Sequence, residues 1–308
     1  MKLKALIIAG PTASGKSRLS LTIGRSFAGE IINGDSQQLY RDFPILTACP
    51  NKEEQTQIPH HLYQILEPHE TCSMGQWREM ALNKIQDVNQ RGKLAIITGG
   101  TGLYLKALLH GISPIPEIPP EIRDQTRALH KEIGNPAFHA LLFQKDPLAA
   151  AKLNPNDSQR LCRAWEVIET TGKSITLWQQ IPSPNLNIPL LLVLPQKSFL
   201  DQTIEERFQQ MLHSGAIEEA AQLLHSPEDI PARKIIGINQ LLDYLEEKID
   251  QKTAIIKAIE ATRQYAKRQL TWFRHQLKPG LTLDAQYSES FNQGIFSFIR
   301  QELLTPDE

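Results

Sequence analysis

The sequence has few cysteines, almost no net charge and no long hydrophobic run. Its three cysteines, Cys49, Cys72 and Cys162, are scattered and include no Cys-x-x-Cys pair. Neither a zinc module nor a disulfide framework is therefore predicted, and a reducing compartment fits best. No segment approaches the length of a membrane span, and no signal peptide is recognisable, because the short N-terminal apolar run leads directly into a glycine-bearing turn. We expect a cytoplasmic protein with no membrane partner.

The composition is that of a globular protein. Of its 308 residues, 41% are hydrophobic and 22% are charged, which excludes a disordered chain, and the length suits one large domain or two ordinary ones. The formal net charge is −1, so any nucleic-acid contact must come from a local basic patch and not from overall attraction.

A phosphate-binding motif lies near the N-terminus. The apolar run 5–9 predicts a strand, and residues 18–27 predict a helix with an apolar face. Between them is a turn whose backbone N–H groups can point at phosphate oxygens, helped by the helix N-terminus. Within it, Lys16 can reach the outer phosphate and the Ser17 hydroxyl can ligate Mg²⁺. The predicted diphosphate-binding residues are Gly10, Pro11, Thr12, Ala13, Ser14, Gly15, Lys16 and Ser17.

Further short apolar runs predict the rest of a parallel sheet. Residues 30–33, 94–97 and 190–194 read as strands, and 74–90 reads as an amphipathic helix. The fold class predicted is α/β, a P-loop NTPase-like parallel sheet flanked by helices. The strand 94–97 continues as Thr-Gly-Gly-Thr, without the acidic Mg²⁺ ligand typical of nucleotide-hydrolysing enzymes, which weakens an ATPase or GTPase interpretation.

Two sets of polar residues allow two interpretations each: Asp35 after the second strand, and a histidine pair in a loop that enters another strand. Asp35 follows the second strand and can lie beside the phosphate loop, since ligands bind beyond the carboxyl ends of parallel strands. It can equally cap the next helix, and its position alone does not decide. The adjacent His60 and His61 invite a metal interpretation, but they share no helix face, so structural or substrate-lining roles are favoured.

Two proline-rich connectors, at 113–120 and 181–184, bracket a helical block. Within the block, Asn156 or Asp157 can cap a helix over 158–171 that ends at Gly172. We therefore expect an inserted small helical subdomain at 113–189, within a catalytic core made of 1–112 and 190–308. The last residues, 305–308, are expected to fray.

Two later helices carry basic residues. Helix 202–224 contains Arg207 directly after Glu205 and Glu206, which favours an exposed ion pair over the alternative of a bidentate diphosphate ligand. In helix 254–276, Arg263, Lys267 and Arg274 lie within about 40° of one another, while Ala266 and Phe273 face the other side. Such a stripe suits a phosphate backbone, or is simply a solvated face, and the sequence leaves both open.

Several stretches together resemble the tRNA dimethylallyltransferases, also called tRNA isopentenyltransferases. They occur in family order across nearly the whole chain and comprise Gly10–Ser17, Asp35-Ser36-x-Gln38-x-Tyr40, Pro59-His60-His61, Gly99-Gly100-Thr101-x-x-Tyr104, Pro155-Asn156-Asp157-x-x-Arg160 and Ala261–Trp272. The resemblance implies transfer of a dimethylallyl group from dimethylallyl diphosphate to N6 of adenosine 37, beside the anticodon, in tRNAs reading codons that begin with U.

The resemblance also implies residue roles. Asp35 matches the general base, Thr12 the contact to the bridging oxygen of the diphosphate, and Arg207 a diphosphate ligand. The inserted subdomain matches the part that grips the tRNA anticodon stem-loop, and we expect Mg²⁺ at Ser17 and a monomeric enzyme. Positions matching tRNA contacts are Asp35, Ser36, Gln37, Gln38, Thr101, Arg123, Gln159, Arg160, Leu161, Cys162, Arg163, Lys234, Gly237, Asn239, Arg263, Lys267, Arg268, Trp272 and Arg274.

The chain departs from the family pattern in places. Residues 42–48, Asn154 and the run 237–240, which contains Asn239, differ from the usual forms and put details of tRNA contact in doubt. Three other functions compete. A small-molecule kinase would need an arginine-bearing lid and an acidic metal ligand, an AMP or ADP isopentenyltransferase would lack the insertion, and a non-catalytic RNA-binding protein need not keep Lys16 and Asp35.

Overall fold

The computed structural model describes residues 3–304, so the expectation for 305–308 lies outside the described residues. The chain divides into two compact units. One comprises the segments up to Leu109 and from Leu186 onward, and the other is His110–Asn185. These bounds lie a few residues before those predicted from the proline-rich connectors.

The first unit is built on a six-stranded sheet with the order β3-β2-β4-β1-β5-β6. Every neighbouring pair is parallel. The predicted α/β fold with a parallel sheet is thus confirmed. The strands are β1 (Ala5–Ala9), β2 (Gly29–Asn33), β3 (His60–His61), β4 (Leu94–Gly99), β5 (Leu190–Val193) and β6 (Leu281–Leu283).

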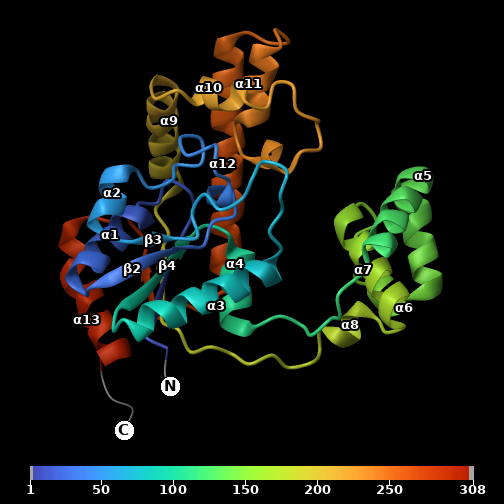
Figure 1. Cartoon of the computed structure of the whole chain (residues 1–308), viewed down its shortest axis with the longest axis horizontal. Coiled ribbons are helices and arrows are strands. Elements are labelled where there is room, and N and C mark those ends of the chain that lie inside the picture. The colour runs from blue at the N-terminus through green and yellow to red at the C-terminus, as the bar shows by residue number, and fades with distance from the viewer. Residues whose placement is uncertain (1–2, 305–308) are drawn as a thin grey trace. The chain divides into compact units, whose positions relative to one another are not determined.

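Helices cover both faces of this sheet (Figure 1). Side chains alternate along β1, so that Leu6 and Ile8 pack with α1 and α13, whereas Ile7 packs into the larger core on the opposite face. Burial on both faces explains why the central strands are continuously apolar. The helices of the larger core are α3 (Met74–Gln90), α4 (Gly102–His110), α9 (Lys197–His213), α10 (Ala216–Ala221), α11 (Ile238–Leu245) and α12 (Gln251–Gln276); those of the other face are α1 (Lys16–Ser26) and α13 (Asn292–Leu304).

Two of the helices predicted from the sequence have the expected bounds, and one predicted helix is in fact two. Helices 74–90 and 158–171 occur with the predicted bounds. The single helix predicted over 202–224 is wrong, because α9 ends at His213 and α10 begins at Ala216. Gly215 separates them with φ of 103°, a left-handed conformation that an α-helix cannot contain. Short elements complete the first unit: α2 (Lys52–Gln57), η1 (Gln37–Leu39), η2 (Pro231–Lys234) and η3 (Glu289–Phe291).

The second unit is entirely helical and has a core of its own. It contains α5 (Pro120–Lys145), α6 (Pro147–Ala150), α7 (Ser158–Thr171) and α8 (Ile175–Trp178). Phe138, Leu142 and Leu161 are fully buried in this core. Asp157 caps α7 by accepting from the Arg160 N–H, and Gly172 ends the helix, as predicted.

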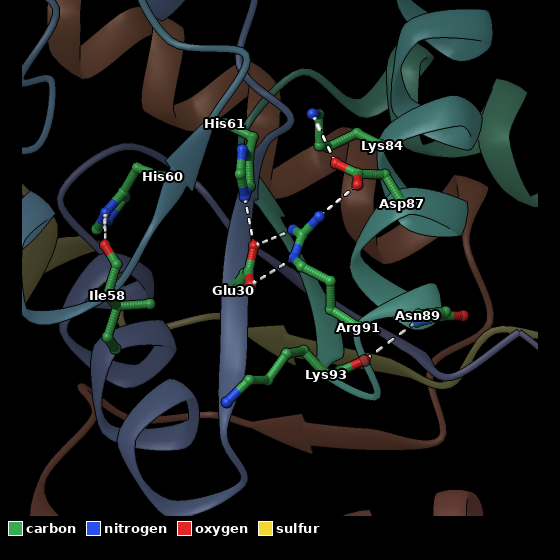
Figure 2. A network of polar contacts seen from close by, with 9 residues as sticks. All are labelled: Glu30, Ile58, His60, His61, Lys84, Asp87, Asn89, Arg91 and Lys93. Carbon is green, nitrogen blue, oxygen red and sulfur yellow. Dashed lines mark hydrogen bonds and ion pairs between the residues drawn. The ribbon is translucent and has the colours of Figure 1, made fainter.

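A polar network fastens β2, β3 and α3 together (Figure 2). Glu30, only 6% exposed, accepts hydrogen bonds from Arg91 at 2.6 Å and binds His61 Nε2 at 2.7 Å. Burial by itself would raise the pKa of Glu30, but these hydrogen bonds more than offset it and lower the pKa below its usual range. His60 instead bonds the Ile58 carbonyl, so the two histidines serve different local contacts.

Across residues 3–304, no group of three His, Cys, Asp or Glu side chains could hold a metal ion. In the same part of the chain, no helix combines the length and apolar character needed to cross a bilayer.

Candidate active site

The phosphate-binding loop joins the carboxyl end of β1 to α1. Its backbone turns through left-handed conformations at Ala13 (φ 64°) and Gly15 (φ 88°), so that α1 begins at Lys16. This is the strand–turn–helix context that the motif requires, and successive N–H groups of such a turn form a concave anion site. The pocket above the loop is lined by Thr12–Ser17 together with Asp35, Gln38, Thr47, Ala48, Thr203, Arg207 and Gln286.

Two cations and one carboxylate share this pocket. Burial lowers the pKa of Lys16 to about 8, with Arg207 lowering it further and Asp35 opposing the shift. Burial also lowers the pKa of Arg207, again opposed by Asp35. Two desolvated cations with only one carboxylate nearby make this pocket suitable for an anionic ligand. A bound diphosphate would raise the lowered pKa values of both Lys16 and Arg207.

Arg207 turns into the pocket. Its guanidinium donates to Thr12 Oγ1 at 2.6 Å, whereas the neighbouring Glu205 bonds Arg263, and Glu206 accepts from Gln202. The exposed ion pair favoured by the sequence therefore does not form with either flanking acid. Since the Thr12 hydroxyl oxygen accepts from Arg207, the hydroxyl proton remains available to donate to a ligand.

Asp35 follows β2 and reaches the same pocket. Its Oδ1 accepts the Gln37 N–H at 3.1 Å, which is the local turn contact expected of a capping residue. Its Oδ2 points toward the Gly100 backbone, 3.0 Å from where a Cβ on that glycine would lie. The two interpretations of Asp35 are thus compatible, because each uses a different carboxylate oxygen.

Asn33, which the sequence reasoning missed, fixes the backbone around Asp35. This fully buried side chain accepts the Asp35 N–H at 2.7 Å and donates to the carbonyls of Asp35 (3.0 Å) and Leu62 (2.9 Å). The backbone carbonyl of Asn33 accepts a hydrogen bond from Trp77 Nε1. An asparagine that directly follows the buried Ile31 and Ile32 at the end of the strand was the available signal, since buried amides persist only where they are bonded.

An apolar cavity extends the pocket. Thr12, Asp35, Thr47 and Arg207 line both the phosphate pocket and this second cavity. Its other walls are mostly apolar and come from Gln37, Leu46, Ile204, Phe208, Met211, Ile236, Thr262 and Tyr265. The continuous site therefore has a cationic end and an apolar end, with Asp35 and Thr12 where they meet.

Glu219, also missed from the sequence, holds one wall of that cavity. From α10 its carboxylate accepts the N–H groups of Ile45 and Leu46 at 2.7 and 2.8 Å. Gln38 holds the same loop from the other side, donating to the carbonyls of Thr47 and Ala48. The segment 42–48 that departs from the family pattern is therefore a firmly anchored wall.

The predicted tRNA contacts of the first unit fall in three places. Ser36 and Thr101 meet through a bond from the Ser36 N–H to Thr101 Oγ1 at 2.9 Å. Gln37 accepts the Ile236 N–H, close in the chain to Lys234 on η2 and to Gly237, which caps the start of α11. Asn239 lies in the first turn of α11, and its side chain donates to the Arg233 carbonyl.

On α12, Lys267, Arg268 and Arg274 are exposed, and the Trp272 ring lies over Gly102. Arg263 differs from this exposed set, because it pairs with Glu205 at 2.8 Å and lies near Asp201, both on α9. Both acids lie on a different helix from Arg263, so residue spacing within helix 254–276 could not predict this pairing.

In the second unit, Arg123 lies on α5 and residues 159–163 lie on α7. Gln159 and Arg160 are exposed, Cys162 and Arg163 are part-buried, and the Leu161 side chain is fully buried in the core. Arg160 and Arg163 pair with Asp157 and Glu166 on or beside the same helix.

Comparison with known proteins gives one consistent result. A family model described as IPP transferase matches residues 38–276. The chain is 47% identical to a tRNA dimethylallyltransferase of Paramagnetospirillum magneticum, over 98% of this chain and 97% of that protein. It is 42% identical to a tRNA dimethylallyltransferase of Rickettsia bellii, over 95% of this chain and 94% of that protein.

Solved structures agree with the sequences. A tRNA isopentenylpyrophosphate transferase from Bacillus halodurans superposes with a TM-score of 0.71 at 34% identity, covering 98% of this chain and 97% of that one. A eukaryotic dimethylallyltransferase, described as acting on tRNA, gives a TM-score of 0.82 at 28% identity, covering 97% of this chain and 78% of that one.

Proposed function

This chain belongs to the IPP transferase family, and on that premise we propose that it transfers the dimethylallyl group of dimethylallyl diphosphate to N6 of adenosine 37 in tRNA. The substrates would be tRNAs reading codons that begin with U, and the products N6-dimethylallyladenosine and diphosphate. The observation that supports this proposal most strongly is the continuous site, in which the pocket above the phosphate-binding loop adjoins an apolar cavity at Thr12 and Asp35. An allylic diphosphate has this same polarity along its length.

The costly part of the reaction is the charge that develops on the departing diphosphate. Lys16, Arg207 and the loop N–H groups are aimed at that charge, so they stabilise it more as the C–O bond breaks. Thr12 donates its hydroxyl proton to the bridging oxygen, because Arg207 already occupies its acceptor side. Departure leaves allyl-cation character on the carbon, which a weak nucleophile such as an adenine amine can attack.

Mg²⁺ suits the Ser17 position. Ser17 is exposed at the start of α1 and lines the phosphate pocket, and Mg²⁺ commonly takes one or two protein oxygens together with phosphate oxygens and water. When bound, the ion would neutralise part of the diphosphate charge.

Asp35 would act as the general base of the reaction. As the new N–C bond forms, the amine carries a surplus proton, which Asp35 accepts, a task worth about 10²–10⁴-fold in rate. Its Oδ2 is free for this, since Oδ1 is engaged by Gln37. The target adenine must leave its stack to reach the site, which is how enzymes that modify bases operate.

RNA would be held by local charge, because the net charge is only −1. The exposed Lys267, Arg268 and Arg274 and the Trp272 ring can contact phosphates and an unstacked base. The helical second unit would grip the anticodon stem. The scattered free cysteines support a cytoplasmic location, where tRNA is modified.

The test is incubation with total tRNA and labelled dimethylallyl diphosphate, with labelled ATP as the competing donor, followed by nucleoside analysis. We expect prenylated adenosine and no phosphoryl transfer. Asp35→Asn should retain tRNA binding and lose most transfer, while the exposed Asp229→Asn serves as the matched control. Phosphate transfer from ATP, or normal product with Asp35→Asn, would contradict the proposal.

A further inference from the structure

One buried amide on α12 bridges the two loops that form the reactive end of the site. Gln269 is 6% exposed and lies between Ala266 and Phe273 on the inward face of the helix. Its Oε1 accepts the Thr12 N–H at 2.8 Å, and its Nε2 donates to the Gly100 carbonyl at 2.8 Å. A buried polar side chain on an apolar face is the unusual observation, and both of its ends are satisfied.

The two bonds join the donor side of the site to the base side. Thr12 belongs to the phosphate loop, and its hydroxyl is bonded to Arg207. Gly100 precedes Thr101, whose hydroxyl oxygen accepts the Ser36 N–H next to Asp35. Gln269 is thus the side chain through which the loop after β1 and the loop after β4 are held at a fixed separation.

Gly100 is shaped around this amide. A Cβ at residue 100 would lie 2.3 Å from Gln269 Nε2 and 3.0 Å from Asp35 Oδ2. The first distance is far too short for two non-bonded atoms, so the amide occupies the space that a side chain at position 100 would fill. This brings the Gln269 side chain close to the carboxylate of the base.

We propose that Gln269 is a positioning residue for the transfer reaction, setting the distance between the bound diphosphate and Asp35 through its paired bonds to Thr12 and Gly100. The inference rests on the proposed function. It requires one acceptor and one donor on the same side chain, since Thr12 presents an N–H and Gly100 a carbonyl. Glutamate offers the donor only when its carboxyl is protonated, and leucine offers neither group.

The decisive variants are Gln269→Leu and Gln269→Glu, with the exposed Gln210→Leu on α9 as control. Steady-state kcat/KM for dimethylallyl diphosphate, measured at saturating tRNA, should fall about 100-fold in Gln269→Leu, the usual cost of a small misplacement of reacting groups. The Kd for tRNA without donor should stay within about threefold, because the side chain points away from the RNA-facing surface. The control should match the wild type.

A pH series separates positioning from a merely structural role. As the pH falls from 8 to 5.5, the kcat/KM of Gln269→Glu relative to the wild type should rise toward recovery, since the protonated carboxyl restores the donor to Gly100. The same ratio for Gln269→Leu should stay flat. A flat ratio for both variants, or a tRNA Kd that rises in step with the loss of kcat/KM, would overturn the proposal.

Binding of inorganic diphosphate, followed by calorimetry, tests the bridge without RNA or turnover. We expect about tenfold weaker binding in Gln269→Leu, the scale on which residues that support a binding group act. Wild-type affinity in that variant would count against the inference. If the wild-type enzyme binds diphosphate but prenylates no tRNA, the proposed function fails while the calorimetry still decides the role of Gln269.

Discussion

Lys16 makes the donor site sensitive to pH in a range where a normal lysine is not. Burial lowers its pKa to about 8, and the ammonium form is the one that would bind the diphosphate in the proposed reaction. The free-enzyme pKa governs kcat/KM, so kcat/KM for dimethylallyl diphosphate should follow the protonated fraction of Lys16. That fraction is roughly 0.9 at pH 7 and 0.09 at pH 9, a loss of about tenfold over two pH units.

The sign follows from the charges around Lys16. A bound diphosphate favours the ammonium form and raises the pKa of Lys16, so kcat at saturating donor should stay flat where kcat/KM declines. Substituting Arg207→Gln removes a neighbouring cation and should move the decline to higher pH, although the variant binds donor more weakly. Asp35→Asn removes the opposing carboxylate and should move the decline to lower pH.

The assay is initial-rate transfer at saturating tRNA between pH 6.5 and 10, with tRNA binding followed separately at each pH. Only the basic side is diagnostic, because phosphate ionisation of the substrate, near pH 6, affects the acid side. If kcat/KM remained constant up to pH 9.5, Lys16 would have an ordinary pKa, and the inference that burial in the phosphate pocket desolvates it would be wrong.

Four further substitutions test other parts of the structure. Asn33→Leu leaves the Asp35 N–H and the Leu62 carbonyl unpaired, and leaves the Asp35 carbonyl with only the Gln38 N–H, so kcat should fall with little change in tRNA Kd, and urea unfolding should show a loss of about 2–4 kcal/mol. Glu30→Gln should cost about 1–2 kcal/mol at pH 7. Because the pKa of Glu30 is lowered by folding, this difference should be fully present above about pH 4.5 and be lost progressively as the pH falls through the lowered pKa in the same assay. Lys267→Glu and Arg274→Glu should each weaken tRNA binding and reduce the slope of log Kd against log salt by about one, with an unchanged slope removing that residue from the interface.

The sequence predicted the parts of this protein that local rules determine. The strand–turn–helix at Gly10–Ser17 needs only glycines, a lysine and apolar flanks, so its position was readable in advance. The place of Asp35 followed from one further rule, that parallel strands end at a common edge. Helices 74–90 and 158–171 were found because their caps and apolar periodicity agree.

The remaining features depend on contacts between segments far apart in the chain. Arg207 was expected to pair with adjacent acids, but those acids face other partners, and the arginine meets Thr12 from 195 residues away. Gln269 could have been noticed as a polar residue on the inward face of its helix. Its partners, however, lie on loops after β1 and β4, which no periodicity connects with α12.

The basic residues on α12 show why the spacing of charges within one helix overestimates the number of cations available to bind RNA. Arg263 lies on the same face as Lys267, yet it is held by Asp201 and Glu205, so its charge is already compensated. Charge reversal there should disturb the packing of α12 on α9 more than it disturbs RNA binding, whereas Lys267 is exposed and its charge is available for the proposed contact with phosphates. The same helix therefore presents cations on its exposed side and the amide of Gln269, bonded to Thr12 and Gly100, on its buried side. In the proposed enzyme, the backbone of this helix would hold the RNA contacts and the bridge between Thr12 and Gly100 in a fixed relation.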